Sequence, residues 1–295
     1  MNILLTGKNG QVGFELQRSL SVLGNVHAID ASDCNLEDPN ALRQVVQHVQ
    51  PQIIVNAAAY TAVDKAETDT LVAQAVNATA PGVLAQEAER LGALCVHFST
   101  DYVFDGTHTG AYTEHDTPNP LNVYGATKLA GEQAVQTACQ RHIILRTSWV
   151  VGAHGNNFAK TMLRLAAERE TLSIVDDQFG APTSAALLAD ITAHIVHQAV
   201  RQPAASFPFG LYHATAGGRT NWHEYACHVI NRAKQAGYPL KVTPDAITPI
   251  PASHYPTPAT RPANSMLSTE KLCATFGLFM PDWRNGVDHI LDQIL

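Results

Sequence analysis

The chain has 295 residues, 45% of them hydrophobic and 15% charged, which is an ordinary composition for a globular protein with a sizeable core. A formal net charge of -7 argues against nucleic acid or an anionic membrane as a partner. The five cysteines are scattered and form no C-x-x-C pair, which is typical of a reducing compartment and argues against a disulfide framework or a structural zinc. No apolar run approaches the roughly 18 residues that span a bilayer, and no basic stretch precedes an apolar one at the start. We therefore expect a soluble, cytoplasmic protein.

The first half of the chain alternates short apolar strands with longer helices, a pattern that indicates βαβ units and a parallel sheet. We expect strands at residues 3–5, 26–29, 53–55, 94–98 and 143–145. Helices are predicted at 11–23, from 38 onward, and at 70–91 and 121–139. The all-apolar third strand, 53–55, is typical of a sheet covered on both faces.

The character of the sequence changes after about residue 150. Helices are expected at 156–170, 184–200, 221–236 and 283–295, with strands at 172–175 and 211–213. The segments 202–209 and 244–262 are rich in proline, so we expect irregular loops there. The predicted fold is α/β, a doubly wound parallel Rossmann sheet in residues 1–150 and a smaller, interleaved α/β substrate lobe in residues 151–295.

Three glycines follow the first predicted strand in a G-x-x-G-x-x-G spacing: Gly7, Gly10 and Gly13. Such a turn lets the backbone approach a pyrophosphate at the positive end of the next helix. A turn with a purely structural role is the alternative, but its place between strand and helix favours a dinucleotide site. Asp30 ends the second strand, where a carboxylate accepts hydrogen bonds from the adenosine ribose.

A candidate catalytic set follows the third and fourth strands. The small residues 56–59 leave room for a cofactor beside the sheet, and Thr100 follows strand four. Tyr124 and Lys128 are four residues apart, so they share one face of a helix. Because a free tyrosine has a pKa of about 10, we expect a nearby ammonium to lower it toward the working pH. Each feature is weak alone, but together they predict a carbonyl reductase.

At these residues the sequence resembles the extended short-chain dehydrogenases and, within them, the dTDP-4-dehydrorhamnose reductases. The resemblance covers nearly the whole chain through the segments 7–13, 56–64, 99–104, 120–125, 146–150, 156–158 and 261–265. It implies NAD(P)H-dependent reduction of the C4 keto group of dTDP-4-dehydro-L-rhamnose to dTDP-L-rhamnose. Tyr124 would donate the proton, Lys128 would hold the nicotinamide ribose and lower the tyrosine pKa, and Thr100 would stabilise the oxyanion.

The resemblance also implies the binding residues. The cofactor groove would be formed by Gly7, Gly10, Gln11, Val12, Gly13, Asp30, Asn35, Leu36, Ala59, Tyr60, Thr61, Phe98, Tyr124 and Lys128. The nucleotide sugar would contact Thr100, Asp101, Trp149 and Arg261. Without the resemblance, Trp149 would be interpreted by default as a buried core aromatic, and Arg261 could instead form an ion pair with a carboxylate.

Two departures from the family pattern bear on the cofactor and the metal. Asn35 stands where relatives usually have aspartate, and no Lys or Arg lies between Asp30 and Arg43. We therefore expect NADH to serve at least as well as NADPH. Some relatives bind magnesium at a dimer contact through two glutamates, and here Glu15 is kept while Ala186 replaces the second. We expect no metal, and a monomer or a metal-independent homodimer.

Two other classes of function remain open from the sequence. An epimerase or dehydratase, or another nucleotide-sugar 4-ketoreductase, could use the same scaffold. A non-catalytic NADP-binding regulatory subunit is also possible, although the intact set of Thr100, Tyr124 and Lys128 argues against it.

Overall fold

A six-stranded parallel sheet is the centre of the molecule, and its strand order places the candidate site. The computed structural model describes residues 1–295, apart from the side chain of Pro244. The strands of this sheet are β1 (Asn2–Thr6), β2 (Asn25–Ile29), β3 (Ile53–Asn56), β4 (Leu94–Thr100), β5 (His142–Thr147) and β10 (Gly210–His213). Their order is β10-β5-β4-β3-β1-β2, with every pairing parallel. Winding reverses at β1, because β2 and β3 lie on opposite sides of it, so a crevice opens at the carboxyl ends of β1 and β3.

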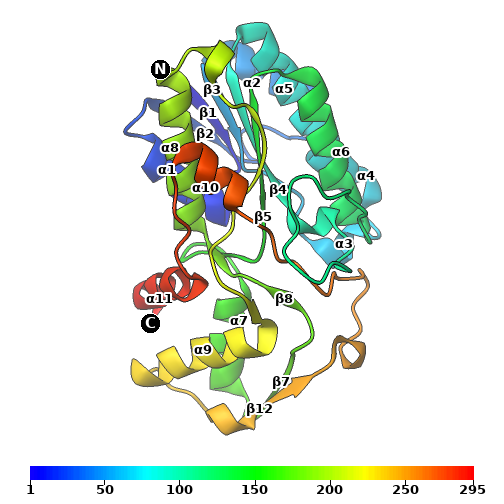
Figure 1. The fold of residues 1–295 in the computed structure, drawn as a ribbon, viewed down its shortest axis with the longest axis vertical. Coiled ribbons are helices and arrows are strands. Elements are labelled where there is room, and N and C mark those ends of the chain that lie inside the picture. The colour runs from blue at the N-terminus through cyan, green and yellow to red at the C-terminus, as the bar shows by residue number, and fades with distance from the viewer.

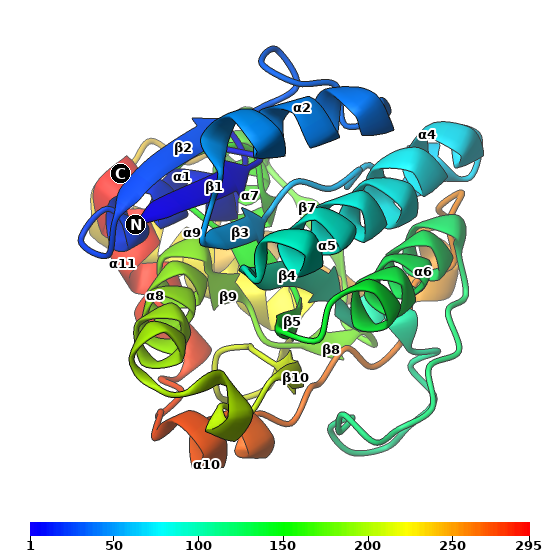
Figure 2. The same cartoon turned by 90° about the horizontal axis from the view of Figure 1, so that it is seen from above.

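Helices cover both faces of the sheet, as Figures 1 and 2 show. One face carries α2 (Pro39–Val49), α5 (Ala80–Leu91) and α6 (Val123–Ala138), and the other carries α1 (Gln11–Leu20), α8 (Ala185–Arg201) and α10 (Glu270–Phe276). Alternate residues of one strand serve the two sides: Ile3 packs in the core beneath α1 and α8, whereas Leu4 packs in the core beneath α2 and α5. Burial on both sides explains why the strands read as continuous apolar runs. The predicted doubly wound α/β fold is confirmed.

Polar residues fix where most of the helices begin. The first-turn N–H groups of a helix lack partners within it, and a side-chain oxygen just before the helix accepts from them. Six helices have such a cap. The capping residues are Asp38 for α2, Asn122 for α6, Asn157 for α7 (Phe158–Glu168), Ser184 for α8, Asn221 for α9 (Trp222–Gln235) and Asp282 for α11 (Trp283–Ile294). At α1 the preceding residue is Gly10, whose lack of a side chain leaves the first N–H groups available to a ligand.

The predicted helix at 70–91 is interrupted in the structure. It consists of α4 (Thr70–Gln74), a π-helical turn η1 (Ala75–Thr79) and α5, and a short helix α3 (Val63–Ala66) that was not predicted precedes them. The wide turn places Asn77 so that it bonds both backbone groups of Tyr60, accepting from its N–H at 2.8 Å and donating to its carbonyl at 3.2 Å. Periodicity could not reveal this irregularity, because it depends on a tertiary contact.

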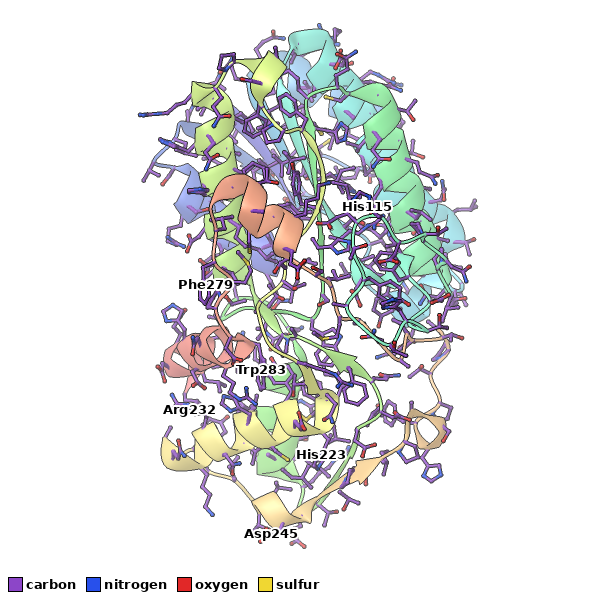
Figure 3. The ribbon with its side chains drawn as sticks, in the orientation of Figure 1. His115, His223, Arg232, Asp245, Phe279 and Trp283 are labelled. Carbon is purple, nitrogen blue, oxygen red and sulfur yellow. The ribbon has the colours of Figure 1, made fainter. Side chains whose placement is uncertain are left out.

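The smaller lobe lies below the sheet in Figure 1. It contains α7, α9, α11 and four strand pieces that form pairs of their own: β7 (Leu172–Val175) with β12 (Ile247–Ile250), and β8 (Phe179–Gly180) with β11 (Thr220–Asn221). A further pair, β6 (Val150–Val151) with β9 (Thr183–Ser184), joins the lobe to the sheet side. Trp283 at the start of α11 packs against Tyr225 and His228 of α9, and Figure 3 labels it in this position.

The prediction that 244–262 is wholly irregular was wrong. Residues Ile247–Ile250 form β12, and Pro249 is tolerated because β12 pairs on one side only, with β7. The rest of the segment holds two short 3-10 turns, Pro244–Ala246 and Ala252–His254. Two similar turns lie at Asp101–Val103 and Ala204–Ser206, the latter inside the predicted loop 202–209. Helix α10 was also missed.

The described helices include none that is both long and apolar enough to cross a membrane.

Candidate active site

A cavity of about 670 Å³ opens at the predicted crevice, and it is lined mostly by residues that follow strand ends. Of the predicted cofactor residues, its lining includes Gly7, Gly10, Gln11, Val12, Asp30, Asn35, Leu36, Ala59, Tyr60, Thr61, Phe98, Tyr124 and Lys128. Gly13 alone lies outside the lining. A side chain there would place its Cβ 2.0 Å from the carbonyl oxygen of Gly7, so this glycine serves the packing of α1 against the turn.

The glycine turn is shaped by a close approach of backbones. Gly7 has a φ of +78°, and a Cβ on it would lie 2.8 Å from the backbone of Ala58 after β3. The Gly7 carbonyl accepts from the N–H of Gly10 at 2.9 Å. Only glycine combines a positive φ with room for the Ala58 backbone at residue 7. The turn leads into α1, whose first N–H groups are uncapped and face the cavity.

The end of the cavity at Asp30 is acidic. The Asp30 carboxylate accepts from the N–H and the hydroxyl of Ser32, at 2.8 and 2.6 Å, and these bonds lower its pKa. Lys8, in the glycine turn, is held by Asp33 at 2.5 Å and does not line the cavity. Among the described residues of the lining, Lys128 is the only lysine or arginine. A 2′-phosphate at Asp30 would therefore meet a carboxylate whose neighbouring cation, Lys8, is already paired with Asp33.

The catalytic candidates meet at the start of α6. Asn122 caps this helix by accepting from the N–H of Gly125 at 2.8 Å. A Cβ on Gly125 would lie 2.1 Å from the Tyr102 carbonyl oxygen, so glycine permits the close approach that seats the helix beneath the end of β4. Thr100 ends β4, donates to Asp101 Oδ1 at 3.0 Å and accepts from the N–H of Tyr102 at 3.2 Å.

Burial sets the protonation of these groups. It raises the pKa of Tyr124 to about 12, against the lowering influence of the Thr100 hydroxyl. Burial also lowers the pKa of Lys128 to about 8, with Glu132 acting in the opposite direction. The Lys128 Nζ donates to the carbonyl of Phe98 at 2.6 Å. The expected lowering of the Tyr124 pKa by Lys128 is thus not observed, because desolvation of the phenol dominates.

Asp101 is the buried carboxylate of the site, with an exposed fraction of 3%. Burial raises its pKa from the ordinary 3.8 to about 6, although hydrogen bonds with Ser265 and Thr100 act against this. Its Oδ2 atom has no hydrogen-bond partner among the described protein atoms. Such an oxygen is suited to accept from a ligand hydroxyl.

A second cavity of about 730 Å³ lies in the lobe, between α7, β7 and the proline-rich segment. Arg164, Arg169 and Arg261 bring positive charge to it, and Trp222 adds an aromatic surface. Neither Trp149 nor Asp101 lines it, and Thr100 lines neither of the two cavities. Asn122 connects the two regions, because its side chain donates to the carbonyl of Thr260 at 2.7 Å while its helix carries Tyr124.

The remaining predicted substrate residues are seen in specific environments. Trp149 has a positive φ of 49°, uncommon for a bulky residue, and its ring stacks on Trp222 at 3.6 Å. Arg261 forms an ion pair with Asp64 of α3 at 2.8 Å, which is the alternative role considered for it from the sequence. It also lines the second cavity. Sequence reasoning missed Trp222, Arg164 and Arg169, which no motif marks.

Several residues of the first cavity were also missed. They include Val76 from the π-helical turn and the hydroxyl residues Ser99 and Thr147 at the ends of β4 and β5. The side-chain oxygens of Ser99 and Thr147 are buried with no partner among the described protein atoms. Their position at strand ends was a signal that could have been used, whereas Val76 depends on the wide helical turn.

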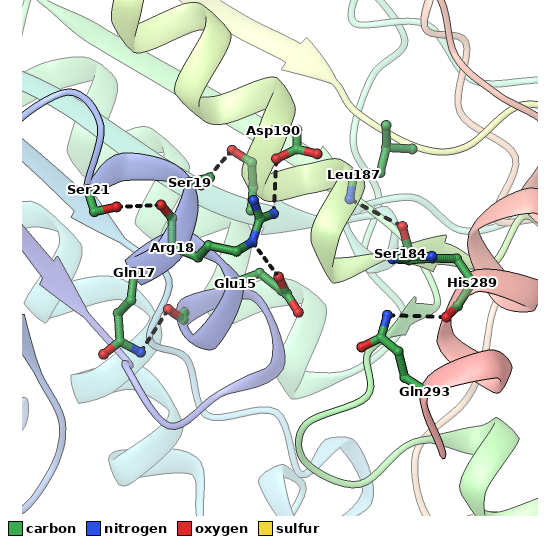
Figure 4. Close-up of polar contacts among 12 residues, drawn as sticks. Glu15, Gln17, Arg18, Ser19, Ser21, Ser184, Leu187, Asp190, His289 and Gln293 are labelled. Atoms are coloured by element: carbon green, nitrogen blue, oxygen red, sulfur yellow. Dashed lines mark hydrogen bonds and ion pairs between the residues drawn. The ribbon is translucent and has the colours of Figure 1, made fainter. Parts of the chain in front are cut away.

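The residues at the family's metal position do not fit a cation. Figure 4 shows that Arg18 reaches between Glu15 and Asp190, and its guanidinium lies 3.4 and 3.2 Å from the two carboxylates. A guanidinium between these carboxylates already supplies the positive charge, and Ala186 contributes no oxygen. Among the described residues, no group of three His, Cys, Asp or Glu side chains could hold a metal ion.

A parallel doubly wound sheet with a glycine turn and a Tyr-Lys pair beside its crevice defines an NAD(P)-binding oxidoreductase of the short-chain dehydrogenase type. The comparisons with known proteins narrow this class. The family model described as "RmlD substrate binding domain" matches residues 1–295. The chain is 52% identical to the dTDP-4-dehydrorhamnose reductase of Salmonella typhimurium, over 100% of this chain and 98% of that protein. It therefore belongs to the dTDP-4-dehydrorhamnose reductase (RmlD) family.

Solved structures agree with this assignment. A dTDP-4-dehydrorhamnose reductase from Clostridium acetobutylicum has a TM-score of 0.91 at 34% identity, covering 99% of both chains. One from Bacillus anthracis, described in complex with NADP, has a TM-score of 0.90 at 35% identity, again covering 99% of both chains. The chain is an enzyme of this family and an NADP-binding oxidoreductase.

Proposed function

We propose that this chain reduces the C4 keto group of dTDP-4-dehydro-L-rhamnose to give dTDP-L-rhamnose. The observation that carries the proposal is the placement of Tyr124 and Lys128 on one face of α6, both in the lining of the first cavity. The family supplies the substrate, since the Salmonella relative is a reductase of that name. Residues 1–150 would hold the cofactor and residues 151–295 the substrate, in a cytoplasmic protein.

Each side chain has a defined part in this proposal. The bound nicotinamide cofactor supplies hydride to the C4 carbon. Tyr124, whose raised pKa keeps it protonated at neutral pH, donates its proton to the C4 oxygen. Thr100, whose hydroxyl donates to Asp101 in the structure, would redirect that hydrogen bond to the same developing oxyanion, and Lys128 would hold the nicotinamide ribose. Gly7, Gly10, Gln11, Val12 and the other lining residues bind the remainder of the cofactor.

We place the nucleotide sugar across the two cavities. Its sugar would lie near Tyr124, Asp101 and Trp149, and its diphosphate near Arg261. Three arginines in the second cavity offset a chain of net charge -7, which otherwise repels a dianionic substrate. Binding of the diphosphate would require Arg261 to share or leave its ion pair with Asp64.

For the cofactor, we propose that NADH serves at least as well as NADPH. Asp30 can accept from the ribose 2′-hydroxyl, and Lys8, the nearest cation in the turn, is held by Asp33. The Bacillus anthracis structure shows that a relative binds NADP, so we propose dual use. We further propose that no metal takes part, and that the protein is a monomer or a metal-independent homodimer, because Arg18 takes the place between the two carboxylates.

The decisive assay follows NAD(P)H oxidation at 340 nm with dTDP-4-dehydrorhamnose and with its UDP and GDP counterparts. We expect turnover with the dTDP sugar and much weaker turnover with the others. Stoichiometric cofactor retained through purification would instead indicate an epimerase or dehydratase. No turnover with any of the three sugars would favour a regulatory subunit.

A further inference from the structure

Four polar side chains form a buried line beneath the first cavity. Thr6, Asn56, His97 and Lys128 come from β1, β3, β4 and α6, and none is more than 2% exposed. Thr6 is paired with Asn56, and Asn56 with His97, in the register of the parallel sheet, so their side chains point to the same face. Buried polar groups are costly unless they bond one another, and these do.

The contacts give the line a direction. The N–H of Ala58 donates to Thr6 Oγ1 at 3.4 Å, and the Thr6 hydroxyl donates to Asn56 Oδ1 at 2.6 Å. The Asn56 amide then presents its Nδ2 to His97 Nδ1 at 3.1 Å. Burial holds the pKa of His97 well below its ordinary value, so the ring is neutral. With the Asn56 amide in this orientation, Nδ1 accepts and the single ring proton of a neutral ring resides on Nε2.

His97 Nε2 lies 3.5 Å from Lys128 Nζ. An Nε2–H group can donate a hydrogen bond to the lone pair of a neutral Lys128 amine. It cannot donate to a Lys128 ammonium, which has donors only, so it disfavours the charged form. Were the Asn56 amide turned by 180°, Nδ1 would donate and Nε2 would accept from the ammonium. The orientation of one buried amide therefore decides which protonation state of Lys128 is favoured.

We propose that His97, held in its Nε2–H tautomer by Asn56, is a positioning residue that sets the protonation state of Lys128. The inference rests on the proposed role of Lys128 in the reaction. His97 itself lines neither cavity, so it acts through Lys128, which lines the first. The Phe98 carbonyl fixes the place of Nζ, and His97 biases its charge.

Other charged groups around α6 are accounted for. They are Tyr124, Asp101 after β4, Glu132, which is paired with Arg146 of β5, and Glu67, which follows α3 and accepts from the N–H of Val123. Glu132 favours the ammonium from one helical turn away, but it accepts two bonds from Arg146, at 2.8 and 2.7 Å. Of these neighbours, only His97 has a ring nitrogen whose tautomer can invert its effect on Lys128.

The first test measures the tautomer directly and needs no substrate. Two-bond ¹H–¹⁵N correlation spectra of ¹⁵N-histidine protein distinguish the two neutral tautomers, and His97→Gln identifies the signal. We expect a neutral Nε2–H ring at pH 7. A ring protonated on Nδ1, or on both nitrogens, overturns the proposal even in wild-type protein.

The second test changes the partner. Asn56→Asp replaces the amide donor with an acceptor, so Nδ1 should donate and Nε2 should accept from the Lys128 ammonium. We expect the His97 spectrum of Asn56→Asp to change to the Nδ1–H tautomer, and the pKa of Lys128, followed through its ¹³Cε signal and assigned with Lys128→Met, to rise by about one pH unit. Adding His97→Gln to Asn56→Asp should remove most of that rise, because only the charge of the new carboxylate then remains; a rise that survives His97→Gln overturns the proposal. The alkaline limb of kcat/KM should move with it, so that the ratio of activity at pH 9 to that at pH 7 rises several-fold. An unchanged or lowered lysine pKa overturns the proposal.

A matched control is available on the edge strand. Asn25 contacts His27 Nε2 at 2.9 Å in an exposed pair on β2. Asn25→Asp makes the same chemical change remote from Lys128 and should leave both readouts unchanged. Because the tautomer and the lysine titration need no turnover, they stand or fall separately from the reductase assay.

Discussion

Replacing Asp101 by asparagine should raise the free energy of unfolding relative to wild type, and the difference should grow as the pH rises. Burial raises the pKa of this carboxyl from 3.8 to about 6. At about 1.4 kcal/mol per pH unit, its ionised form costs the folded state about 3 kcal/mol above pH 6. The folded state binds the proton more tightly than the unfolded state, so this cost is absent below pH 3.8 and grows as pH rises through the window to 6. An asparagine carries no such charge.

The assay is denaturant unfolding of wild type and Asp101→Asn at several pH values. The free energy of unfolding of wild type, relative to the variant, should fall by about 2 kcal/mol between pH 4.5 and pH 8. A constant offset from the new amide, whose NH₂ replaces the partnerless Oδ2, does not affect this slope. Asp105→Asn is the control, since hydrogen bonds from Thr107 and Asn119 lower the pKa of Asp105. For this variant the free energy of unfolding of wild type, relative to the variant, should rise with pH instead of falling. A flat difference for Asp101→Asn would refute the reasoning.

Four further outcomes are expected. Tyr124→Phe should lose about 10²–10⁴-fold in turnover while its cofactor affinity, measured by fluorescence titration, stays the same; near wild-type activity would contradict the proton-donor role. Wild-type activity should decline as pH rises through about 8, where Lys128 loses its proton, and Lys128→Met should have a low residual rate whose alkaline limb lies at higher pH; an unchanged limb would exclude Lys128 as its source. The kcat/KM with NADH should equal or exceed that with NADPH, and a strong preference for NADPH would show that Asp30 does not select. EDTA should alter neither activity nor sedimentation, whereas a dimer seen only with magnesium would show that the Arg18 bridge is not a substitute for the metal.

The sheet and its helices could be predicted because their signals are local. Residues 53–55 of β3 are apolar because both faces of the sheet are covered, and Asp38-Pro39 starts α2 with a capping carboxylate followed by a proline. The π-helical turn at Ala75–Thr79 could not be predicted, because it is stabilised by the bonds of Asn77 to Tyr60, 17 residues away. The strand at Ile247–Ile250 depends likewise on pairing with β7, which overrides the proline-rich composition.

Most of the lining of the first cavity could be anticipated for the same reason, because its residues follow strand ends in chain order. The substrate side could not. Trp222 and Arg164 reach the second cavity from two helices of the lobe, and only the fold brings them together with the segment around Arg261. The tautomer of His97 is further still from sequence reasoning, since it depends on contacts across three neighbouring strands.

Burial shifts the pKa values of the proposed proton donor, Tyr124, and of the neighbouring Lys128 in opposite directions, and the shift of the donor suits reduction. An enzyme that oxidises an alcohol to a ketone needs a phenolate to accept a proton, whereas a reductase needs a phenol that is protonated before the substrate binds. Desolvation raises the pKa of Tyr124 to about 12 and so keeps the phenol protonated at physiological pH. The same desolvation lowers the pKa of Lys128 to about 8, within reach of neutrality, where an amine can both give and regain a proton. The site thus combines a phenol that stays protonated with a neighbouring lysine whose charge can change near neutral pH.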